Sequence, residues 1–137
     1  MYQETSKIKI PLSVVVLITL FMPLISGIFP VPIYCHPSPV IYEPQPNQII
    51  SSIETIPNEV TITFTEKPEI KASSIRVMDF NNERVDNQDL KLANSDKSLS
   101  VSLDKLKLKA GTYTINWLIL SKDDGFMTKG TYTFSIS

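Results

Sequence analysis

The stretch TYTINWLIL, residues 112–120, predicts a long β-strand with one buried face. Its large apolar side chains recur at every second position and therefore share one side of the strand: Tyr113, Ile115, Trp117 and Ile119. Gly111 precedes the stretch, which fits a strand that is entered through a tight corner. Tyr113 is therefore expected to return its hydroxyl to the backbone at this corner, as in a tyrosine corner.

Four shorter stretches repeat this alternation and are predicted as further strands: VTITF (60–64), IRV (75–77), LSVSL (99–103) and TYTFSI (131–136). The Asn81-Asn82 pair predicts a turn, and residues 84–92 form a polar strand candidate. The five prolines of residues 36–58 predict an extended edge strand and an irregular loop. No segment of ten or more residues beyond position 35 keeps a helical period. The chain is therefore predicted to be all-β, an immunoglobulin-like antiparallel β-sandwich with Greek-key connections.

Residues 1–35 have the features of an export signal rather than of a folded domain. Lys7 and Lys9 lie in a short polar start, and the stretch 10–29 that follows carries no charge. A segment broken by prolines then leads to Cys35. This order of basic, apolar and processing regions predicts a signal peptide that is cleaved directly after the cysteine.

A retained membrane anchor over residues 8–29 is the alternative, because an apolar run of about 20 residues is long enough to span a bilayer. Cleavage would make His36 the first residue of the mature protein, whereas an anchor would leave it inside the chain. In both cases the basic start stays in the cytoplasm. The domain of residues 36–137 is therefore predicted to be extracytoplasmic, either periplasmic or at the cell surface.

The charge balance argues against a nucleic-acid-binding protein, and the cysteine content excludes a domain stabilised by internal disulfides. The chain has 13 Lys and Arg against 14 Asp and Glu, a net charge of −1. Residues 1–35 contribute one acidic and two basic residues, so the remainder has a net charge of −2. This balance lacks the basic footprint of nucleic-acid binding. Because Cys35 is the only cysteine, no disulfide can form within the chain, and an apolar core must hold the domain together.

Several fragments, in their order and spacing, resemble the CopC family of extracytoplasmic copper-resistance domains. The matching pieces cover nearly all of the domain: HPSPVIYEP (36–44), TITFTE (61–66), GTYTINW (111–117), Ser121, DDG (123–125), Gly130 and YTFSI (132–136). They stand where the family has its mature N-terminal His, a strand ending in Phe and Glu, an Asp-Gly-His turn and a closing strand. The resemblance implies a copper-binding protein of copper resistance or homeostasis.

One residue of the turn departs from the family pattern. Phe126 stands where the family has its histidine, and Asp124, which precedes Gly125, matches the turn aspartate. The resemblance implies a Cu(II) ion held by the amine and imidazole of the first residue, by the turn histidine and by carboxylate oxygens. The metal ligands carried over to this chain are therefore His36, Glu66 and Asp124, without the second imidazole.

This reduced ligand set still fits copper chemistry. Cu(II) prefers tetragonal nitrogen and oxygen ligands, and a free α-amine on His36 would close a chelate with its own imidazole. Pro37 has no N–H, so copper cannot recruit the amide of the second residue. The site is predicted to be weaker than that of the family because one nitrogen ligand is missing. Met127 offers a thioether, which would suit Cu(I) as the alternative oxidation state.

A second interpretation belongs to a different functional class. If Phe126 marks the loss of copper, or if residues remain ahead of His36, the sandwich is a copper-free interaction module tethered to the outer face of the membrane. Neither interpretation is an enzyme, because the single histidine leaves no Ser or Cys nucleophile with a base partner. As a copper carrier, the protein would exchange its ion with a membrane copper transporter, the partner that the resemblance suggests.

Overall fold

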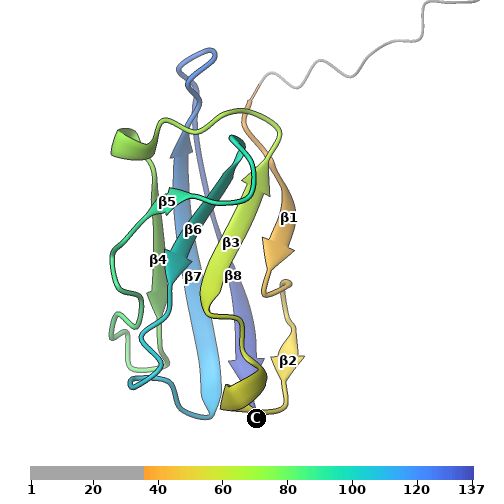
Figure 1. Ribbon diagram of the computed structural model, residues 1–137, viewed down its shortest axis with the longest axis vertical. Coiled ribbons are helices and arrows are strands. Elements are labelled where there is room, and N and C mark those ends of the chain that lie inside the picture. The colour runs from red at the N-terminus through yellow and green to blue at the C-terminus, as the bar shows by residue number, and fades with distance from the viewer. Residues whose placement is uncertain (1–35) are drawn as a thin grey trace, which may run out of the picture. The chain divides into compact units, whose positions relative to one another are not determined.

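Two four-stranded β-sheets face each other in the computed structural model, which describes residues 36–137 (Figure 1). The first sheet has the order β1 (Pro39–Glu43), β3 (Glu59–Phe64), β6 (Ser98–Ser102) and β5 (Lys91–Leu92). The second has the order β2 (Ile49–Ile50), β8 (Met127–Ile136), β7 (Gly111–Leu120) and β4 (Ser74–Met78). Two short 3-10 helices, η2 (Ile53–Thr55) and η3 (Ile70–Ala72), lie in the connections. The predicted β-sandwich is confirmed.

The pairing is antiparallel throughout except at one edge. β2 pairs in parallel with the end of β8, where Ile49 and Ile50 lie opposite Ser135 and Ile136. β1 forms the edge of the other sheet, so residues 36–58 supply an edge strand to each sheet, whereas the prolines predicted one edge strand and an irregular loop. The sandwich is therefore mixed at this edge rather than strictly antiparallel.

The core lies between the sheets and consists of the side chains that alternate inward. Tyr113 stacks on Phe134 of the neighbouring strand with ring centroids 5.2 Å apart. Trp117 crosses to the other sheet, where its ring meets Phe64 at 5.6 Å. Gly130 lies opposite Trp117 in β8, and a Cβ atom there would come within 2.4 Å of the indole. A glycine is required at this position because the tryptophan ring fills the space that a side chain would need.

The predicted tyrosine corner is also present. The Tyr113 hydroxyl donates to the Lys109 carbonyl oxygen and accepts from the Lys109 N–H, both at 2.7 Å. These two bonds satisfy a hydroxyl that the core would otherwise leave unpaired. They also fix the approach to β7, at the end of the sandwich opposite the β7–β8 turn.

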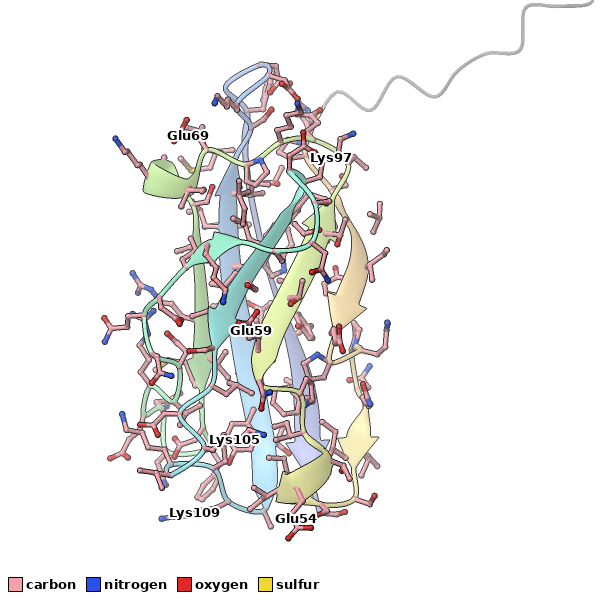
Figure 2. The ribbon with its side chains drawn as sticks, in the orientation of Figure 1. Glu54, Glu59, Glu69, Lys97, Lys105 and Lys109 are labelled. Carbon is pink, nitrogen blue, oxygen red and sulfur yellow. The ribbon has the colours of Figure 1, made fainter. Side chains whose placement is uncertain are left out.

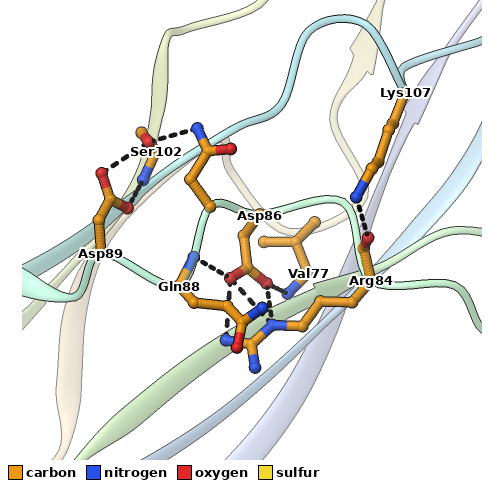
Figure 3. A network of polar contacts seen from close by, with 8 residues as sticks. Val77, Arg84, Asp86, Gln88, Asp89, Ser102 and Lys107 are labelled. Carbon is orange, nitrogen blue, oxygen red and sulfur yellow. Dashed lines mark hydrogen bonds and ion pairs between the residues drawn. The ribbon is translucent and has the colours of Figure 1, made fainter.

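The predicted polar strand over residues 84–92 is wrong. Only β5 and isolated bridges at Arg84 and Asp86 form there, and Gln88 has a φ of 60°. The reason is the side chain of Asp86, which is fully buried and accepts the N–H groups of Val77 and Gln88 at 2.8 and 3.0 Å (Figure 3). A carboxylate that takes up backbone donors in this way replaces a regular strand ladder.

The predicted signal peptide or anchor of residues 1–35 lies outside the described residues. From position 36 onward, the structure contains no helix with the length and apolar character needed to cross a bilayer. The division into a leader of residues 1–35 and a CopC-like domain of residues 36–137 stays a prediction.

Candidate metal centre

One end of the sandwich carries all three predicted ligands. His36 lies three residues before the start of β1, Glu66 lies two residues after the end of β3, and Asp124 lies in the turn between β7 and β8. β1 and β3 are antiparallel, with Pro39 opposite Phe64, so the start of one strand meets the end of the other. In Figure 1 the start of β1, the end of β3 and the β7–β8 turn all lie at the top.

Hydrogen bonds hold the chain beside His36 in place. Ser38 donates its N–H to the Thr65 hydroxyl at 3.0 Å, and its carbonyl oxygen accepts the Thr65 N–H at 2.9 Å. Pro37 is buried, and its carbonyl oxygen accepts the Thr128 hydroxyl at 2.6 Å. The N-terminal segment is thereby tied both to the end of β3 and to β8. The role of Thr128 could not be predicted from the sequence, because a hydroxyl on a strand has no preferred partner before the fold is known.

The β7–β8 turn is organised around Ser121, which is buried. Its hydroxyl oxygen accepts the N–H groups of Asp123 and Asp124 at 3.2 and 3.4 Å. Asp124 in turn accepts the Phe126 N–H on Oδ1 at 3.0 Å, while its other oxygen, Oδ2, is left for further partners. Gly125 has a φ of 74°, a left-handed conformation that glycine adopts without strain. The turn therefore presents an exposed carboxylate in a defined backbone setting.

The electrostatics of the turn favour an ionised Asp124. The Phe126 N–H lowers the pKa of Asp124 below its ordinary value, and the charge of the nearby His36 contributes to the same shift. The imidazole of His36 and the carboxylate of Asp124 are thus close enough to interact. Only the family resemblance, and no spacing in the sequence, assigned these two residues to one site.

Glu66 is held between the two other parts of the site. Thr65 before it is bonded to Ser38, and Lys67 after it donates its N–H to Asp123 Oδ2 at 3.5 Å. The Glu66 Oε2 atom is buried and has no hydrogen-bond partner. Within residues 36–137, two other buried side-chain oxygens lack a partner, but they belong to the neutral hydroxyls of Ser100 and Tyr132.

The lysines around Glu66 are engaged elsewhere. Lys97 lies at this end of the sandwich (Figure 2) and donates its Nζ to the Thr65 carbonyl oxygen at 2.8 Å. Lys67 forms an ion pair with Asp96, with Nζ and Oδ2 2.7 Å apart. Neither ammonium group satisfies the buried oxygen of Glu66.

His36 is exposed, and its ring contacts Phe126. The two ring centroids are 4.3 Å apart and the ring planes are tilted by 55°. The residue that replaces the expected histidine therefore lies directly beside His36. Met127, by contrast, begins β8 on its exposed side, with Lys129 and Thr131 at the next outward positions. Strand alternation thus directs Met127 away from the face of Thr128, which contacts the His36 segment.

The structure brings the three predicted residues to one end but not into one cluster. Within residues 36–137, no three side chains of His, Cys, Asp or Glu lie together as a group that could hold a metal ion. His36 and Asp124 are both exposed, so their side chains are free to rearrange around a ligand.

Comparisons with known proteins agree with this architecture. Protein YobA from Escherichia coli strain K12 is 36% identical over 87 residues, which are 63% of this chain and 68% of YobA. The corresponding protein of Shigella flexneri gives the same values. A crystal structure of CopC from Methylosinus trichosporium OB3b has a TM-score of 0.62 at 23% identity, covering 74% of this chain and 94% of that chain. PcoC, a methionine-rich copper resistance protein from Escherichia coli, has a TM-score of 0.61 at 22% identity, covering 74% and 99%.

The family model for the CopC domain matches residues 43–137. The match contains Glu66 and the turn with Asp124, and it begins seven residues after His36. It covers both sheets except for β1, of which it contains only the last residue, Glu43. On this match, which covers more than half of the sequence, the chain belongs to the CopC family.

Proposed function

We propose that this protein is an extracytoplasmic copper-binding protein that holds one Cu(II) ion at the end of the sandwich formed by His36, Glu66 and the β7–β8 turn. Membership of the CopC family supports this function, and two structurally similar proteins are the copper resistance protein PcoC and a CopC. Binding and release by ligand exchange, without catalysis, would suit a copper carrier in resistance or homeostasis. A membrane copper transporter is the proposed partner.

The buried oxygen of Glu66 is the observation that carries this proposal. A carboxylate oxygen withdrawn from water without a partner is costly, and a bound cation removes that cost. Glu66 lies between a segment bonded to Ser38 and a residue bonded to Asp123. Glu66 therefore has a buried oxygen that a cation could satisfy, at the end of the sandwich that also carries His36 and Asp124.

His36 supplies the nitrogen ligands if the mature chain begins there. Its α-amine and imidazole then form one chelate, and the buried Pro37 fixes the backbone behind it through Thr128. Glu66 and Asp124 add the oxygen atoms that complete a tetragonal Cu(II) site. The outward position of Met127 favours Cu(II) over Cu(I), because a thioether would then not face the imidazole.

The proposed site is weaker than one with two histidines. Phe126 cannot coordinate a metal, and the three candidate ligands do not form a ready-made cluster. Copper binding would have to order the exposed His36 and Asp124 side chains, which lowers affinity. Weak binding is compatible with a carrier, since the ion must leave for its partner.

A copper-free interaction module is the second candidate function. The observation that favours it is Phe126, which occupies the position of the expected imidazole and already contacts His36. In that case the end of the sandwich would serve protein contacts, and no metal would be required.

Intact mass of the exported protein and Cu(II) titration decide between the two. We expect export to yield a chain that begins at His36, and we expect this chain to bind one Cu(II). A matched chain whose His36 α-amine is acetylated, and a His36→Ala variant, should both lose most of the affinity because the amine–imidazole chelate is destroyed. If all three chains bind copper equally, the proposed site at His36 is rejected. If none binds it, the copper function is rejected in favour of the interaction module.

A further inference from the structure

We propose that Phe126 is a positioning residue for copper binding: its ring holds the His36 imidazole at the β7–β8 turn, although it supplies no ligand atom. This inference rests on the proposed function and assigns a role to the residue that replaces the expected histidine. It begins from the ring contact, with centroids 4.3 Å apart and a tilt of 55°. Tilted aromatic pairs at such distances are attractive beyond the apolar surface that they bury.

The turn fixes Phe126 from two sides. Its N–H donates to Asp124 Oδ1 at 3.0 Å, and its carbonyl oxygen accepts the Ser121 N–H at 2.7 Å. Ser121 is buried and is itself anchored by its position at the end of β7. The ring is therefore attached to a backbone that belongs to the rigid part of the sandwich, even though half of its own surface is exposed.

His36, in contrast, has little else to hold its side chain. Its carbonyl oxygen accepts the Ser38 hydroxyl at 3.3 Å, and its neighbour Pro37 is anchored by Thr128. These bonds fix the backbone but leave the imidazole exposed to solvent. The contact with Phe126 thus restricts the imidazole. It holds the ring at the β7–β8 turn, which also contains Asp124.

A restricted imidazole binds a metal more tightly than a free one, because less side-chain entropy is lost on binding. For one rotamer-rich side chain this difference corresponds to about a two- to tenfold change in the dissociation constant. Phe126 would therefore compensate in part for the nitrogen ligand that it displaces. A leucine or alanine at this position would supply neither a ligand atom nor an aromatic ring to hold the imidazole.

The test compares variants at Phe126 in the chain that begins at His36. This chain retains the whole apolar core, because the buried core residues lie within residues 50–136. We expect Phe126→Ala to weaken Cu(II) binding about two- to tenfold in competition with a chromogenic chelator. Phe126→Tyr restores the ring and should restore affinity to within about twofold of the parent chain. Phe80→Ala is the matched control, because Phe80 is similarly exposed but contacts Gly111 at the opposite end of β7.

Nuclear Overhauser effects between the His36 and Phe126 ring protons in the metal-free chain test the contact independently of copper. Their absence, or Phe126→Ala binding copper as tightly as the parent chain, would overturn the inference. A failure of the proposed function looks different, because His36→Ala would then leave copper binding unchanged. Circular dichroism of each variant establishes that the sandwich is intact.

Discussion

Asp86 and Glu66 are two acidic residues that the sandwich withdraws from water in opposite ways. The Asp86 side chain is fully buried, and its two oxygens accept bonds from Val77, Gln88 and the Arg84 guanidinium (Figure 3). The guanidinium also forms an ion pair with it, with Nη2 and Oδ1 2.9 Å apart. Glu66, only partly buried as a residue, leaves its Oε2 buried with no partner.

The difference separates a structural acid from a candidate ligand. Asp86 closes the edge of β4, since its carboxylate takes the Val77 N–H that a further strand would otherwise bind. Every oxygen of Asp86 is occupied, so it has no capacity for a metal. Glu66 lies at the end of the sandwich that also carries two further candidate ligands, His36 and Asp124. A structural buried acid such as Asp86 finds its hydrogen-bond partners within the fold. A buried acid without such partners, like Glu66, is a candidate to bind a partner from outside the chain.

Removal of the paired acid should have the largest effect on stability. Asp86→Ala leaves the Arg84 guanidinium and two backbone N–H groups without their acceptor, so we expect a loss of about 3–5 kcal/mol in the free energy of unfolding. Urea denaturation followed by tryptophan fluorescence measures it. Asp89→Ala is the control, because Asp89 lies nearby but is exposed. A loss below about 1 kcal/mol for Asp86→Ala would mean that the buried network is not what holds β4.

Restoring the missing imidazole should have the next largest effect, and it tests the proposed copper site at the Glu66 end of the sandwich. Phe126→His places a second nitrogen ligand beside His36, so we expect Cu(II) affinity to rise at least about tenfold. This equals at least about 1.4 kcal/mol of binding free energy. Chelator competition gives the affinity, and electron paramagnetic resonance gives the number of nitrogen ligands. An unchanged affinity would place the copper site away from this turn.

A pair of buried tyrosines repeats the contrast without any metal. Tyr113 has both hydroxyl bonds of its corner, whereas the buried hydroxyl of Tyr132 has no partner and burial raises its pKa. We expect Tyr113→Phe to destabilise the fold by about 1–2 kcal/mol and Tyr132→Phe to be neutral or slightly stabilising. Thermal and urea unfolding of both variants measure the difference. Equal losses would show that hydrogen-bond pairing does not decide the cost of a buried polar group here.

The smallest effect concerns the dependence of stability on pH. The Ser102 hydroxyl and N–H bind Asp89 and lower the pKa of its carboxyl group. A lowered folded pKa means that the stabilisation is present above the unfolded value of about 3.9 and is lost as the pH falls toward the folded value. Asp89→Asn should therefore cost less than about 1 kcal/mol at pH 7, because the group is exposed, and this cost should shrink as the pH falls below about 3.9. A constant difference across this range would exclude the carboxylate charge as the cause.

The regular strands could be predicted from the sequence because their side chains obey a simple alternation. Tyr113, Trp117 and Phe134 all face inward as their spacing indicates. The failure over residues 84–92 has a physical cause, since Asp86 is a polar residue that the fold buries. Alternation of polar and apolar residues contains no signal that a carboxylate will replace a strand as the partner of a backbone N–H.

The candidate site was predictable in its location but not in its geometry. The family resemblance named His36, Glu66 and Asp124 as ligands of one ion, and the structure has all three at one end of the sandwich but not in one cluster. The ring contact of Phe126 and the unpaired oxygen of Glu66 depend on side-chain conformations that no spacing in the sequence encodes. Whether the three ligands close around an ion depends on the same conformations.

The Cu(II) affinity of Glu66→Gln, in the chain that begins at His36, tests most directly whether the unpaired oxygen is a copper ligand. The amide keeps the shape of the side chain but removes its charge, so we expect at least about a tenfold loss of affinity by chelator competition. The free energy of unfolding of the metal-free variant should be unchanged or higher, because an unpaired buried charge has been removed. A variant that binds copper as tightly as the parent chain would contradict the proposed site.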